Sequence, residues 1–226
     1  MKIAEEKFYQ QILDIINSED KYNVPEVMIH HIEDTDFSVE QSKIVSSWLL
    51  DFALKNRDNH DSKDKSTLFF SVSSAIRTGA SMLYPYQVER LFPLLETGHI
   101  IDTSLVTVKM ISRIFEAQPP SIIGEYEVVA EKMCEIVDEI SNDSSAKLSH
   151  IDAAIIQLCI IALIGMGSKK VYQILEQFKN KEKWITSYIL HNIKDLKKAW
   201  QKRKDPISKP MDEFINETIN FFEKEK

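Results

Sequence analysis

The amino-acid sequence predicts an all-α fold, and three observations carry this prediction. The chain holds only 5 glycines and 7 prolines in 226 residues, below the average usage of about 7% and 5%, which leaves few turn residues for a β-protein. Apolar residues recur every three or four positions, the period of one buried helix face. The helical segments also follow one another in pairs, and because one pair cannot cover its own apolar stripe, several must stack.

The N-terminal third is predicted to form four helices separated by polar breaks. Ser38 and Gln41 have the spacing of a capping box, in which the serine side chain accepts a free backbone N–H and the glutamine reaches back. The break at residues 58–64 separates the last two helices. The predicted helices cover residues 3–17, 25–32, 38–57 and 62–80.

The rest of the chain continues the same pattern. Pro85 is at a position that a first helical turn tolerates, Gly98 is a typical helix stop, and Pro119-Pro120 ends the next helix. A last amphipathic helix is mostly polar on its outer side, as expected of a terminal cap. The predicted helices cover residues 84–97, 102–117, 121–141, 148–166, 168–179, 182–203 and 211–222.

Four predicted pairs start at residues 38, 84, 121 and 168, and these intervals are close to the roughly 40–47 residues of two-helix solenoid units. Three segments resemble HEAT-like repeats: Leu91-Phe-Pro-Leu-Leu95 with the helix that follows Asp102, Ala153 to Gly165, and Trp184 to Ile193. The arginine common early in the second helix of such repeats is missing after Asp102, and the unit lengths are irregular. An irregular helical array without true repeats is the alternative.

This resemblance implies an irregular right-handed α–α superhelix of about five stacked antiparallel helix pairs. The chain would form a single helical-repeat domain over residues 1–226. Within it, residues 1–80 would be atypical N-terminal helices, 84–203 the HEAT-like pairs and 207–226 the capping helix.

No catalytic signature is recognised, so we expect a protein that is not an enzyme. Cys134 and Cys159 fall in apolar windows, where a thiolate is disfavoured. We interpret them as free thiols in a reducing compartment. The charged N-terminus lacks a secretory pattern, and the longest apolar stretch, residues 155–166, is far shorter than the roughly 20 residues that span a bilayer. These features favour a cytoplasmic protein with no membrane partner.

Histidine and carboxylate side chains gather at two places. Adjacent His30 and His31 point about 100° apart on a helix, so only one of them could share a metal with Glu33 or Asp34. His60-Asp61 resembles the dyad of HD-type phosphohydrolases, which implies divalent metals, but here the dyad lies in a polar break. We therefore expect no metal, no cofactor and no catalytic residue.

The charge is unevenly distributed. Residues 1–167 carry 14 Lys/Arg and 26 Asp/Glu, a net −12, whereas residues 168–204 carry 11 and 3, a net +8. A local excess of this size attracts anionic partners, although helices also expose lysines to solvent without binding anything. The candidate binding residues are Lys169, Lys170, Lys181, Lys183, Lys194, Lys197, Lys198 and Lys202.

Two functions from different classes follow from these patterns. The first is a non-enzymatic adaptor, inhibitor or immunity-type protein that grips a protein partner, with the acidic part of the chain engaging a basic one. The second is a nucleic-acid-binding α-solenoid similar to the HEAT-like DNA alkylpurine glycosylases, using the basic 168–204 surface. Exposed tryptophans beside the lysines would favour the nucleic-acid-binding function, but we expect Trp184 and Trp200 to be core or edge residues. We expect Tyr84 and Tyr86 to pack at a helix start as a hydrophobic staple.

Overall fold

A computed structural model describes residues 2–19, 21–22, 24, 26–59, 65–96, 99–143, 149–178 and 183–224. These residues form helices joined by turns, and none of them lies in a strand, which confirms the all-α prediction. The chain divides into two compact units, residues 1–110 and residues 111–226, each with its own core. The division falls within one helix, and the single helical-repeat domain over residues 1–226 stays a prediction.

Unit 1 contains α1 (Lys2–Ile16), α2 (Glu26–Glu33), α3 (Val39–Asn56), α4 (Lys65–Ser81), η1 (Pro85–Leu95) and the first half of α5 (Ser104–Ala117). The predicted capping box is confirmed at the start of α3, where Gln41 N donates to Ser38 Oγ and Ser38 N donates to the Gln41 side chain. Each helix begins and ends within a few residues of its predicted bounds.

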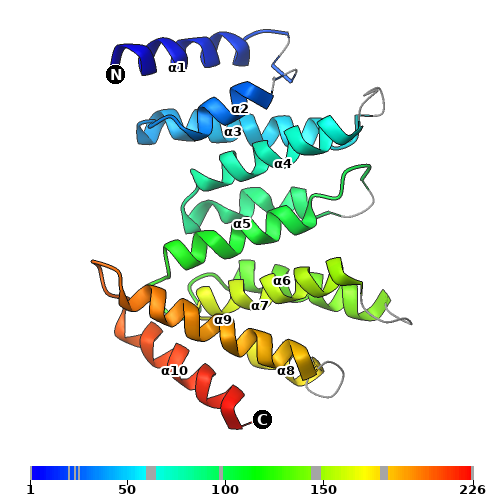
Figure 1. The fold of residues 1–226 in the computed structure, drawn as a ribbon, viewed down its shortest axis with the longest axis vertical. Coiled ribbons are helices and arrows are strands. Elements are labelled where there is room, and N and C mark those ends of the chain that lie inside the picture. Colours follow the sequence, from blue (N-terminus) through cyan, green and yellow to red (C-terminus); the bar gives the residue numbers. More distant parts are fainter. Residues whose placement is uncertain are drawn as a thin grey trace. The chain divides into compact units, whose positions relative to one another are not determined.

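Helix α3 is the centre of unit 1, because α1, α4 and η1 all pack against it, and α2 packs on α4. Consecutive α3 and α4 run in opposite directions (Figure 1), as the predicted pairing of 38–57 with 62–80 requires. A Cβ added to Gly79 would lie 3.2 Å from Leu49 Cβ, so the two helices approach closely there. Trp48 is buried and donates through Nε1 to Lys21 O at 2.8 Å, which fixes the preceding turn on α3.

The segment predicted as an α-helix over 84–97 is instead a 3₁₀-helix, η1. Pro93 lies inside it and has no N–H to donate, so a regular i→i−4 ladder cannot pass through this position. Thr103 Oγ1 donates to Leu94 O and so joins the end of η1 to the start of α5. The predicted stop at Gly98 lies outside the described residues.

Unit 2 contains the second half of α5, α6 (Glu127–Asp143), α7 (His150–Gly165), α8 (Val171–Phe178), α9 (Lys183–Gln201) and α10 (Lys209–Lys224). The predicted helix over 121–141 begins only at Glu127, because residues 121–126 form turns around Gly124, whose φ is 78°. The predicted pairs α6 with α7 and α8 with α9 pack together, and α9 also packs on α10 (Figure 1).

Helix α7 is the core element of unit 2 and contacts α6, α8 and α9. Its side chains are apolar on nearly every side, and Ile156, Ile160 and Ala162 have no exposed surface. A Cβ on Gly165 would lie 3.0 Å from Phe115 Cβ, so α7 also approaches α5 closely. Among the described residues, no helix is both long enough and apolar enough to cross a membrane.

Candidate binding surface

The lysines predicted to form a basic surface lie in unit 2, on α8, α9 and the turns beside them. Lys169, Lys198 and Lys202 are exposed, whereas Lys170, Lys194 and Lys197 are partly buried. Lys181 lies outside the described residues, and of Lys183 only the place at the start of α9 is described. The structure therefore places six of the eight candidates, and their contacts differ.

Lys170 is engaged by two carboxylates of α6. Its Nζ lies 3.1 Å from Glu127 Oε1 and 3.7 Å from Glu131 Oε1. The hydrogen bond to Glu127 raises the pKa of the Lys170 ammonium, because it favours the charged form. The side chain thus links the start of α8 to α6 within unit 2, and part of its charge is already neutralised.

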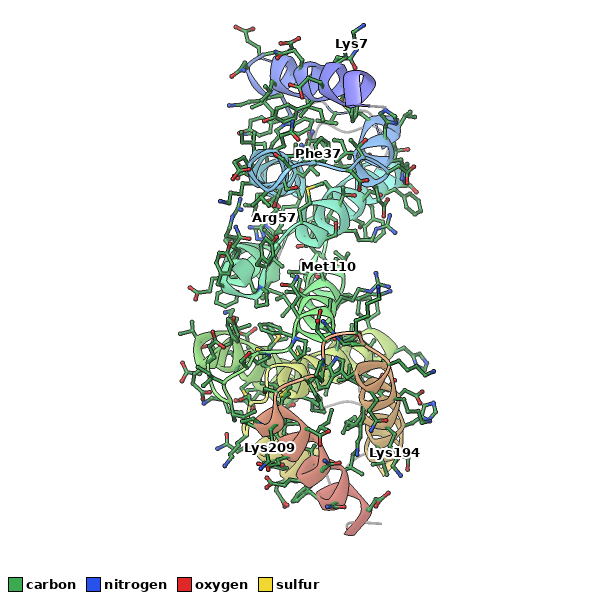
Figure 2. All side chains as sticks on the ribbon, turned by 90° about the vertical axis from the view of Figure 1, so that its left-hand side faces the viewer. Lys7, Phe37, Arg57, Met110, Lys194 and Lys209 are labelled. Atoms are coloured by element: carbon green, nitrogen blue, oxygen red, sulfur yellow. The ribbon has the colours of Figure 1, made fainter. Side chains whose placement is uncertain are left out.

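Three lysines of α9 are also bound to neighbouring side chains. Lys194 Nζ, labelled in Figure 2, pairs with Glu223 Oε1 of α10. Lys197 Nζ donates to Asn216 Oδ1 of α10. Lys198 pairs at 3.2 Å with Asp195, three residues earlier on the same helix. Lys194 and Lys197 therefore hold α10 on α9, a role that a count of charges along the sequence does not reveal.

The far end of α9 has a structural role as well. Trp200 is buried, and its Nε1 donates at 2.7 Å to Glu116 O at the end of α5. Arg203 donates from Nη1 to Ala117 O, so both residues satisfy carbonyl groups that a helix C-terminus leaves unpaired. The prediction of Trp200 as a packing residue is confirmed. The Trp184 side chain lies outside the described part of the chain.

An open cleft of about 510 Å³ lies beside Lys169 and Lys170. Gly167 lines it with a φ of 68°, and a Cβ there would lie 2.6 Å from Ile123 Cδ1, so this position requires glycine. The polar side chains of the lining are Glu127, Gln173 and the two lysines. The cleft brings together no nucleophile and base, and it has the character of a charged surface depression.

Neither cysteine is placed for catalysis. Both are free thiols, as predicted. Burial raises the pKa of Cys134 and, more strongly, that of the fully buried Cys159. A thiolate, which is the nucleophilic form, is therefore disfavoured at both positions.

The histidine candidates of the sequence give no assembled metal site in the described part of the chain. His30 Nδ1 lies 3.7 Å from Glu33 Oε2, and His31 packs edge-on against Phe8. No group of three or more His, Cys, Asp or Glu side chains with metal-binding geometry occurs among the residues that could be searched. His60-Asp61 lies outside them.

A charged cluster in unit 1 had no signal in the sequence, because its members come from separate segments. Arg57, which lies between α3 and η1 in Figure 2, is buried and donates from Nη1 to Pro93 O and from Nη2 to Glu96 Oε2. His99 Nδ1 lies 2.7 Å from Asp58 Oδ2. Burial opposes ionisation of Asp58, but His99, a backbone hydrogen bond from Ile100 and the charge of Arg57 together outweigh it and lower the pKa of the carboxyl. The cluster joins the end of α3 to the loop after η1.

Unit 1 also exposes aromatic side chains in two contacting pairs. Phe69 and Phe70 on α4 meet edge to face, with ring centroids 5.8 Å apart. Tyr84 and Tyr86 stack with their planes 9° apart and their centroids at 5.7 Å, and they are 40% and 67% exposed. The expectation that these tyrosines staple a helix start is wrong: Leu83 and Pro85 are buried instead, and the two rings face solvent.

Comparison of the chain with models of protein families, with curated proteins and with solved structures gives no significant match.

Proposed function

We propose that this chain is a non-enzymatic helical-repeat protein, with a HEAT-like arrangement of its helix pairs, that binds another protein. The observation that carries the proposal is the pair of exposed aromatic contacts in unit 1. Phenylalanine and tyrosine are enriched at the centres of protein interfaces, because large rings bury much apolar area and lose little conformational entropy. Four such rings left in solvent have no role in the core of unit 1.

The charge of unit 1 indicates the sign of the partner. Residues 1–110 carry 11 Lys/Arg and 17 Asp/Glu, a net −6, whereas residues 111–226 carry 17 and 18. An acidic unit attracts a basic protein and repels polyanions. This supports a basic protein as the partner over a nucleic acid.

The contacts of the basic segment weaken the nucleic-acid alternative. Lysines that bind phosphate must be available to replace released counterions, but Lys170, Lys194 and Lys198 pair with carboxylates of the same unit. Trp200 is buried and cannot stack on a base. Among the candidates whose side chains the structure describes, Lys169 and Lys202 are exposed and remain for this second function.

Affinity capture distinguishes the two functions. Tagged protein is incubated with lysate of the source organism, with and without nuclease, and the bound species are identified by mass spectrometry. Each complex is then reconstituted from purified components. A protein that stays bound after nuclease treatment and forms a stoichiometric complex supports the proposal. Capture that disappears with nuclease, together with a band shift of labelled duplex or single strand, supports the alternative instead.

A further inference from the structure

Two helices of unit 1 lie side by side and run in the same direction. Figure 1 shows η1, the segment between α4 and α5, running parallel to α3. Two contacts fix their register: Arg90 Nη2 donates to Ser47 Oγ at 2.9 Å, and further along Arg57 reaches Pro93 and Glu96. The N-terminal ends of both helices therefore extend the same way from the Arg90–Ser47 contact.

Helical periodicity places specific side chains beyond this contact. On the side of η1, a 3₁₀-helix that rises about 2 Å per residue, Tyr84 is the residue just before the helix and lies about 12 Å before Arg90 along its axis. On α3, Glu40 lies two turns and about 10 Å before Ser47, with Ile44 between them on the same stripe. Tyr84 and Glu40 are thus level along two neighbouring helices, and we name the surface formed by Glu40, Ile44, Tyr84 and Tyr86 the α3–η1 face.

The α3–η1 face combines exposed apolar groups with negative charge. Ile44 is 43% exposed, and the two stacked tyrosines are 40% and 67% exposed. The chain around it, residues 33–51, carries five carboxylates against the single Lys43, and Asp36 and Glu40 are exposed. Arg90 is hydrogen-bonded to Ser47, so its guanidinium already has a partner on α3.

We propose that the α3–η1 face binds an arginine-containing segment of a basic protein partner, with a guanidinium stacked on the Tyr84–Tyr86 pair and paired with a neighbouring carboxylate. Guanidinium groups are planar and weakly hydrated, so they stack on aromatic faces better than an ammonium does. The net charge of −6 in unit 1 favours this occupant over an anionic one. The inference rests on the proposed function and identifies the chemistry of its partner.

The test uses the full chain and two capped peptides of equal charge, octa-arginine and octa-lysine, measured by calorimetry at low salt. Octa-arginine is expected to bind the wild-type protein more tightly than octa-lysine. The double variant Y84A/Y86A should lose about five- to tenfold in octa-arginine affinity and should no longer distinguish the peptides. Y84F/Y86F, which keeps the rings, should retain the preference.

The matched control is I122A/V128A, which removes two exposed apolar side chains of unit 2 and should bind both peptides as the wild type does. Equal affinity of the wild-type protein for the two peptides, or unchanged binding by Y84A/Y86A, would overturn the inference. So would a dimer in light scattering that Y84A/Y86A converts to monomer, because a second copy would then cover the face. If a captured protein partner binds Y84A/Y86A normally, the inference fails while the proposed function stands; if no protein is captured, the proposed function fails.

Discussion

The two units use their polar and aromatic residues in opposite ways. In unit 2 the lysines that form the most basic segment of the chain hold helices together: Lys170 joins α8 to α6, and Lys194 joins α9 to α10. In unit 1 one cation, Arg57, is buried as a link between α3 and η1, while tyrosine and phenylalanine rings lie in solvent. A charged segment is therefore not by itself a binding surface, because its charges can have partners within the fold.

The largest expected effect tests whether α7 is the core of unit 2. Ala162→Asp places a charge where the side chain has no exposed surface, and we expect a loss of about 3–5 kcal/mol in the free energy of unfolding. Chemical denaturation measures it. Ile151→Asp, at an exposed position in the first turn of the same helix, is the control and should change stability little. Equal effects of the two substitutions would show that α7 is not buried.

The next effect concerns the buried cation of unit 1. Arg57→Met keeps the apolar stem but removes the donors to Pro93 O and Glu96, so we expect a loss of about 1–3 kcal/mol. Lys55→Met, at an exposed position of α3, controls for the loss of one positive charge. Urea denaturation measures the free energy of unfolding of both variants. An Arg57 variant as stable as the Lys55 variant would show that the contacts of Arg57 do not stabilise unit 1.

A smaller effect tests whether the lysines of α9 act inside unit 2. Lys194→Glu would place a carboxylate opposite Glu223, which lies on α10. We expect a loss of about 0.5–1 kcal/mol, reduced by salt because the pair is partly exposed. Lys202→Glu, at an exposed position just beyond α9, should leave stability unchanged. Thermal melts at low and high salt measure the stability of both variants. If the lysines only form a solvated face, the two variants should have the same melting temperature.

The smallest effect is a pH dependence in unit 1. The folded-state pKa of Asp58 is lowered, so its contribution to stability is fully present above the ordinary carboxyl pKa of about 4 and is lost as pH falls through the lower folded value. The stability difference between wild type and Asp58→Asn should therefore shrink as pH falls from 6 towards 3. Asp51→Asn, at an exposed position of α3, controls for the removed charge. A difference that stays constant over this range would contradict the role of His99.

Local patterns in the sequence predict most of the helices. The Ser38 capping box, the scarcity of glycine and proline, and the apolar stripe that includes Ile189, Ile193 and Trp200 each specify a helix from neighbouring residues alone. The very apolar sequence of α7 likewise predicts burial, because no polar face is left to meet water. The free thiols and their apolar surroundings follow from the same reasoning.

Tertiary structure decided what the separate segments do to one another. The sequence by itself determined the helices, their approximate bounds and the +8 segment. Only the fold brought Lys194 to Glu223 and Arg57 to Pro93. It also left Tyr84 and Tyr86 exposed, whereas the sequence had suggested that they pack at the start of a helix. The physical reason is that hydrogen bonds, ion pairs and burial depend on distances between residues far apart in the chain, which helical periodicity does not contain.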